Sequence, residues 1–185
     1  MASKKIPQIF GLALLIGLLI FPGARAPAAS GGSSREYEIK AAYLYNFINY
    51  IEWEEQSRMP AGGTITIGVV GENPFGPALG PLNGKQIKGR TLAVREVSSP
   101  TDLKNCQIVF ISSSEKERFP GILESLKDAK ILTVSEIDGF AEHGGIINFI
   151  SERNKVRFEI NQEAARSKGL TISSELLKLA RLVKS

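Results

Sequence analysis

Cysteine and histidine are almost absent from this chain of 185 residues, which has one of each. The single cysteine, Cys106, excludes an intramolecular disulfide, so packing alone must hold the fold together. The single histidine, His143, has no neighbouring cysteine or second histidine, whereas metal sites need three or four ligands at defined spacing. We therefore expect no metal and no cofactor.

Catalytic and nucleotide-binding motifs are also missing. The glycines of residues 68–76 lack the G-x-G-x-x-G spacing of a dinucleotide-binding turn, and residues 80–86 lack both the spacing and the Ser/Thr of a P-loop. Asp138, Glu142 and His143 share one loop, but sequence proximity in a loop does not make an acid/base group. We expect a protein that is not an enzyme, with an envelope enzyme as an alternative.

The N-terminus has the pattern of a secretory signal peptide. Lys4 and Lys5 precede an uncharged stretch over residues 9–21, and Ala26 and Ala28 occupy the small-residue positions of a cleavage site. The alternative is an uncleaved membrane anchor, but a bilayer-spanning helix needs about 20 apolar residues. The sequence therefore predicts a signal peptide over residues 1–28, cleaved after Ala28, and a mature protein outside the cytoplasm.

Charge of one sign is not in excess once the leader is removed. The whole chain has 23 basic and 19 acidic residues, and the mature 157 residues have 20 and 19. A nearly neutral chain lacks the dense basic face of a nucleic-acid-binding protein. A local asymmetry remains, because residues 153–185 carry eight basic and three acidic residues. The C-terminal fifth is thus a basic pole.

The pattern along the mature chain predicts one α/β domain over residues 34–185, after a flexible lead-in at residues 29–33. Apolar and β-branched runs predict strands at residues 64–71, 91–97, 107–111 and 131–134. Helical spacing and capping residues predict helices at residues 34–53 and 116–127. Strands that alternate with helices imply a mixed, mostly parallel sheet with helices on both faces.

The C-terminal part differs from this alternation. Residues 146–150 and 155–160 flank a polar turn and predict a β-hairpin with one solvated face. Asn161 is placed to cap a helix that Gly169 ends. A last helix is expected after Ser173, with a core-facing stripe formed by Ile172, Leu176, Leu179 and Val183.

Three features of the sequence allow more than one interpretation. The stripe Tyr43, Phe47 and Tyr50 is core or a surface for a ligand or partner, and helical spacing favours core. Cys106 opens an apolar run, so it is a buried small hydrophobe, with a reactive thiol or an intermolecular disulfide as alternatives. On the hairpin, a set of basic residues forms an ordinary solvated face or a partner contact: Arg153, Lys155 and Arg157.

Several blocks of the chain resemble the YfiR family of periplasmic proteins. The blocks keep their order and spacing over nearly the whole mature chain: residues 40–47, 67–71, 106–112, 144–149, 156–161 and 169–180. Family members often carry cysteine pairs, whereas here Cys106 alone matches, so control through an internal disulfide is not expected.

The resemblance implies regulation by binding. The family's namesake is a soluble periplasmic inhibitor of an inner-membrane diguanylate cyclase, which lowers cyclic-di-GMP and biofilm formation. By this resemblance we expect a periplasmic regulator whose partner is an inner-membrane diguanylate cyclase or related sensor. No nucleic-acid partner and no stable membrane insertion of the mature chain are expected, and a homodimer is left open. The alternative function is a small-ligand-binding sensory module.

Overall fold

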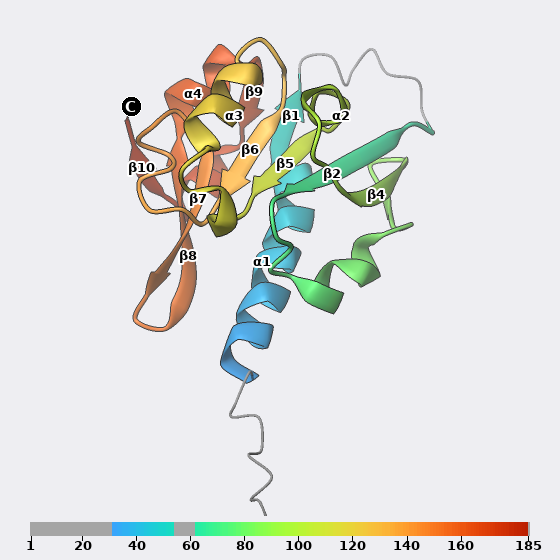
Figure 1. Ribbon diagram of the computed structural model, residues 1–185, viewed down its shortest axis with the longest axis horizontal. Helices are drawn as coiled ribbons and strands as arrows, with labels where there is room; N and C mark the ends of the chain where they lie inside the picture. The colour runs from blue at the N-terminus through green and yellow to red at the C-terminus, as the bar shows by residue number, and fades with distance from the viewer. Residues whose placement is uncertain (1–30, 54–61, 185) are drawn as a thin grey trace, which may run out of the picture.

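The computed structural model describes residues 31–53 and 62–184; the predicted cleavage site at Ala28 lies outside the described residues. These residues form an eight-stranded sheet (Figure 1). Its strands are β2 (Thr64–Val70), β3 (Gln86–Ile87), β4 (Arg90–Glu96), β5 (Ile108–Ile111), β6 (Leu132–Ser135), β7 (Ile147–Glu152), β8 (Lys155–Asn161) and β10 (Arg181–Val183). The spatial order is β10-β8-β7-β6-β5-β2-β4-β3.

The centre of the sheet is parallel and its flanks are mixed. Strands β4, β2, β5, β6 and β7 run parallel. Strand β3 pairs antiparallel with β4, β8 pairs antiparallel with β7, and β10 is parallel to β8. A separate antiparallel pair joins β1 (Ile51–Trp53) to β9 (Leu170–Ile172). The expectation of a mostly parallel mixed sheet is confirmed.

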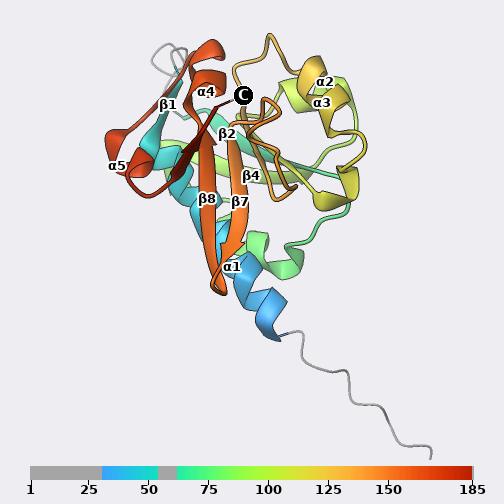
Figure 2. The same ribbon diagram turned by 90° about the vertical axis from the view of Figure 1, so that its left-hand side faces the viewer.

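Helices lie on both faces of this sheet (Figures 1 and 2). They are the α-helices α1 (Gly31–Tyr50), α2 (Pro100–Lys104), α3 (Phe119–Ser125), α4 (Gln162–Ser167) and α5 (Ser174–Leu177), and the 3₁₀ helices η2 (Gly76–Leu82) and η3 (Ser113–Glu115). Two hydrophobic clusters divide the core. Ile108 and Phe110 of β5 pack in the cluster with α1, whereas Val109 and Ile111 pack in the cluster with α2 and α3. The period of two places successive side chains on opposite faces.

Helix α1 packs by its aromatic stripe against the C-terminal hairpin. Phe47 is fully buried, and its ring centroid lies 5.4 Å from that of Phe158 and 5.9 Å from that of Phe149. Tyr43 is edge-on to Phe158 at 5.3 Å. The core interpretation is therefore confirmed for Phe47, whereas Tyr43 is half-buried and packs against the core from its edge. The interpretation is wrong for Tyr50, which is exposed at the end of the helix.

Two predicted helices have different bounds in the structure. Helix α1 ends at Tyr50 rather than residue 53, because Ile51 and Trp53 are buried in β1, which pairs with β9. Helix α3 begins at Phe119 rather than residue 116, with Pro120 in its first turn, where a missing N–H costs nothing. The preceding residues form η3, which Ser112 caps.

The predicted last helix is wrong beyond its first turn. Ser173 caps α5 as expected, but α5 ends at Leu177 and Leu179 is 61% exposed. Residues 181–183 instead form β10, in which Arg181 lies beside Glu159 of β8 and donates to its carboxylate. The backbone N–H and C=O groups of residues 181–183 therefore form hydrogen bonds with β8, instead of the hydrogen bonds that they would form within a helix.

The hairpin is confirmed, with a tight turn. Arg153 and Asn154 have φ values of 51° and 59°, as a two-residue type I′ turn requires. Asn161 caps α4 by accepting from the N–H of Ala164, and Gly169 ends it at a φ of 65°. The face expected to be solvated differs in one respect, because Glu159 is buried and accepts hydrogen bonds from Arg181 and Asn148.

Cys106 is a buried small residue, as its favoured interpretation stated. It is 3% exposed, its thiol donates to the carbonyl of Asp102 at 3.4 Å, and burial raises its pKa. We expect Cys106→Ser to lower the free energy of unfolding by about 1–3 kcal/mol, since a hydroxyl replaces a thiol in an apolar site. Urea unfolding measures this. Rapid alkylation of the native thiol at neutral pH would contradict its burial.

Candidate functional site

The three basic hairpin residues are exposed at the end of the hairpin. Arg153 lies in the turn, Lys155 begins β8 opposite Glu152, and Arg157 lies opposite Ile150. The hairpin extends alongside the N-terminal half of α1 (Figure 2). This arrangement brings Lys155 and Arg157 together with residues of α1, whereas Arg153 lies outside their shared groove.

A groove of about 840 Å³ runs between α1 and the hairpin, and we call it the α1–hairpin groove. Its apolar surface comes from Ile39, Tyr43 and Val156, and its basic residues are Arg35, Lys155 and Arg157. Ile39 is 41% exposed within this groove. Glu36 also lines this groove, but its carboxylate pairs with Lys40. The groove is therefore amphipathic and basic.

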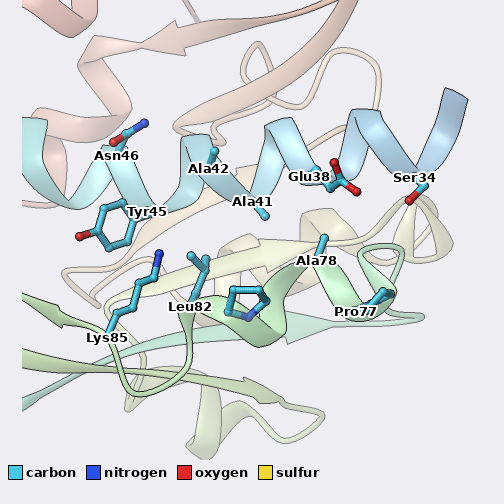
Figure 3. A pocket seen from close by; sticks show the side chains of 11 residues that line it. Ser34, Glu38, Ala41, Ala42, Tyr45, Asn46, Pro77, Ala78, Leu82 and Lys85 are labelled. Carbon is cyan, nitrogen blue, oxygen red and sulfur yellow. The ribbon is translucent and has the colours of Figure 1, made fainter. Parts of the chain in front are cut away.

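A second groove, of about 430 Å³, lies on the other side of α1, against η2 (Figure 3). We call it the α1–η2 groove. Small side chains such as Ala41, Ala42 and Ala78 line its middle, while Glu38 lies toward one end and Lys85 toward the other. The Lys85 ammonium sits 5.3 Å from the centre of the Tyr45 ring. Helix α1 thus has a groove along each side.

A buried ionic cluster fixes α1 to the carboxyl end of β6. Lys40 is 5% exposed, and its Nζ lies 2.5 Å from Glu36 Oε1 and 2.6 Å from Glu136 Oε2. Tyr37 donates to Glu136 Oε1 at 3.1 Å, and Lys40 Nζ lies 4.6 Å above its ring. Glu136 directly follows β6, so this cluster sets the position of the helix that lines both grooves.

Tyr37 remains a hydrogen-bond donor in this cluster. Burial raises the pKa of its hydroxyl, and the charge of Glu136 and the hydrogen bond to it raise the pKa further. The phenol is therefore protonated at neutral pH and satisfies one carboxylate oxygen while Lys40 satisfies the other. Each oxygen of the Glu136 carboxylate thus has a hydrogen-bond donor, one charged and one neutral, as a buried ion pair requires.

The loop that holds His143 has a structural explanation. The His143 Nδ1–H donates to the carbonyl of Gly139 at 2.7 Å, and its ring lies edge-on to Phe119.

Over residues 31–53 and 62–184, the structure shows no group of three or more His, Cys, Asp or Glu residues that could hold a metal ion. None of the helices in that part of the chain is both long and apolar enough to cross a bilayer.

Comparison with known proteins identifies a family and a partial likeness in fold. The family model described as YfiR/HmsC-like matches residues 37–181. A conserved domain protein from Vibrio cholerae O1 biovar eltor has a TM-score of 0.52 at 14% identity, with 80% of this chain and 60% of that chain covered. No curated protein matches the chain.

A second solved structure has a weaker likeness. It is described as an ABC domain in complex with L-Trp from Streptococcus pneumonia, and its TM-score is 0.47 at 14% identity, with 64% of this chain and 55% of that chain covered. The chain therefore spans little more than half the length of these two solved chains. At 14% identity the Vibrio structure indicates a shared fold alone.

Proposed function

The chain belongs to the YfiR/HmsC-like family, and we propose that it is a non-enzymatic periplasmic regulator that binds and inhibits an inner-membrane diguanylate cyclase or a related membrane sensor. The observation that carries the proposal is the family match over residues 37–181. Membership of this family is consistent with a periplasmic regulator of cyclic-di-GMP signalling. A regulator of this kind acts by binding the inactive state of its partner more tightly than the active state.

The α1–hairpin groove is the surface we propose for the partner. Its apolar surface and its three basic side chains suit an amphipathic segment that carries acidic residues. Arg35 and Arg157 offer planar guanidinium groups, which bind carboxylates through two parallel hydrogen bonds. The groove is also preorganised, because the Lys40 cluster holds α1 and a tight turn closes the hairpin. Preorganisation lowers the entropy cost of binding.

Crosslinking in intact cells tests this surface. A photoreactive residue in place of Ile39 should crosslink to a membrane protein with a periplasmic region, because Ile39 is exposed inside the groove. Reversing Arg35, Lys155 and Arg157 to glutamate should reduce that crosslink about tenfold or more, since three attractive contacts become repulsive. The crosslinked protein is identified by mass spectrometry.

A matched charge reversal provides the control. Lys104, Lys116 and Arg166 are exposed and lie outside both grooves, so reversing them changes the net charge equally and should leave the crosslink intact. Equal loss in both triple variants would show a general charge effect and remove the groove from the proposal. Arg153→Glu, tested alone, shows whether contact extends to the hairpin turn.

A further inference from the structure

A third groove lies at the carboxyl ends of β2 and β4, beside α2 and α3, and has a volume of about 570 Å³. We call it the β2–β4 groove. The chain leaves β2 toward η2 and β4, on the side of the cluster with α1, but leaves β5, the other neighbour of β2, toward α3 and β6, on the side of the other cluster. The connections after β2 and β5 therefore diverge in opposite directions along the sheet, and Glu115 and Arg118, which follow β5, line the groove. In open α/β sheets, ligands bind in the crevice that such a divergence creates.

The turn after β2 forms part of the groove wall with backbone atoms, because its residue Gly71 has no side chain. Gly71 lines the groove with a φ of 84°, a conformation that favours glycine. A side chain at Gly71 would begin 2.4 Å from Ser114 Oγ and 2.8 Å from Glu115 Cγ. Ser114 Oγ also accepts from the N–H of Glu72, which fixes the turn against η3. The shape of the groove is thus built into the loop.

The walls of the β2–β4 groove combine apolar surface with excess negative charge. Val97, Leu103 and Ile122 supply apolar surface, and a volume near 570 Å³ is typical of small-molecule sites. The charged side chains that line it are two carboxylates, Glu96 and Glu115, and one guanidinium, that of Arg118.

The carboxylate of Glu115 is buried, which strengthens its interaction with a charged ligand. Its side chain is only 5% exposed, so its charge is less screened by solvent than a surface carboxylate. Arg118 donates to Glu115 Oε1 at 2.7 Å, but the Arg118 side chain is 76% exposed and leaves the carboxylate with lone pairs for another donor. Glu96 is exposed and adds a second negative charge at the same groove.

We propose that the β2–β4 groove binds a small organic cation, with its ammonium group at Glu115 and Glu96 and its apolar body against Val97, Leu103 and Ile122. The excess of carboxylates favours a cation over an anion of the same shape. This proposal is independent of the proposed partner surface, because the groove shares no residue with the α1–hairpin groove.

Calorimetric titration of the purified protein with 2-phenylethylammonium tests the proposal. Saturable binding at millimolar ligand is expected, together with a rise in the melting temperature. Two probes of similar shape measure how the affinity depends on ligand charge. Neutral 2-phenylethanol should bind about tenfold more weakly than the ammonium, and anionic 3-phenylpropionate more weakly still. Equal binding of all three probes, or no binding of the ammonium, would overturn the proposal.

Two variants locate the site. A Cβ atom added at Gly121 would meet no atom within 4 Å, so Gly121→Leu should occupy the groove without disturbing the fold and reduce binding about tenfold. The control is Ala42→Leu, which fills the exposed α1–η2 groove and should leave binding unchanged. Glu115→Gln keeps the shape and should weaken the ammonium more than the alcohol. Binding that survives both Gly121→Leu and Glu115→Gln would place the cation elsewhere and refute the proposal.

Discussion

Replacing Lys40 with alanine should lower the free energy of unfolding by about 3–5 kcal/mol, one of the largest effects expected of a single substitution in this chain. Lys40 is almost fully buried and neutralises Glu136, whose side chain is 10% exposed. Removing the ammonium leaves a carboxylate charge inside the protein with Tyr37 as its neutral donor. Urea unfolding followed by circular dichroism measures the loss.

Two comparisons separate this effect from a general loss of lysine. Lys127 also pairs with a glutamate on its own segment, Glu124, but both side chains are largely exposed, so Lys127→Ala should leave the unfolding curve nearly unchanged. The double variant Lys40→Met/Glu136→Gln removes both charges and should recover most of the lost stability. Equal losses at Lys40 and Lys127 would contradict the role of the cluster.

The fold follows from the sequence where the pattern is strong and local. Ile108 to Ile111 alternate between two hydrophobic clusters, and the short β-branched run that contains them is recognisable without any tertiary information. The hairpin likewise has strands with alternating apolar and polar residues, joined by a polar turn. Asn161 caps α4 with its own side chain, so the start of that helix is also visible in the sequence. The signal for each of these elements lies within a few residues, although β5 is paired in the sheet with the distant strands β2 and β6.

The predictions from the sequence are wrong where pairing with a distant strand decides the structure. Leu176, Leu179 and Val183 have helical spacing, yet residues 181–183 form β10 because β8 offers a free edge and Glu159 binds Arg181. In the same way, Ile51 and Trp53 continue the apolar pattern of α1 but belong to β1, whose partner β9 lies over 100 residues away in sequence. A periodic pattern does not identify a distant strand partner.

The candidate sites were only partly predictable for the same reason. Exposed charges on the hairpin were identified from alternation, but the α1 side of their groove, Arg35 and Ile39, depends on how the hairpin lies along the helix. The Lys40 cluster was missed, although a signal exists: Glu36 precedes Lys40 by four residues, and Lys40 stands beside the buried Ala41. The third member, Glu136, lies 96 residues away, so sequence spacing does not predict it.

Deleting the gene for this protein should raise cellular cyclic-di-GMP severalfold, because an inhibitor that acts by contact releases its cyclase when it is lost. The expectation rests on membership of the YfiR/HmsC-like family and on the proposed function. Mass spectrometry of nucleotide extracts measures the change. Expression of the whole chain should restore the low level, and the mature N-terminus, read by mass spectrometry, should follow Ala28.

Three variants, each expressed in the deletion strain, separate secretion of the protein from binding of its partner. A chain without residues 1–28 should fail to restore the low cyclic-di-GMP level, because it would not reach the compartment in which the partner's sensor region lies. The Arg35, Lys155 and Arg157 reversal should also fail, while the Lys104, Lys116 and Arg166 reversal should succeed, since only the first set lines the α1–hairpin groove. If both reversals complement, the partner binds elsewhere on a genuine regulator. If cyclic-di-GMP is unchanged by the deletion itself while the cyclases are expressed, the regulatory proposal fails, and a cation-binding module built on the β2–β4 groove becomes the better account of the protein.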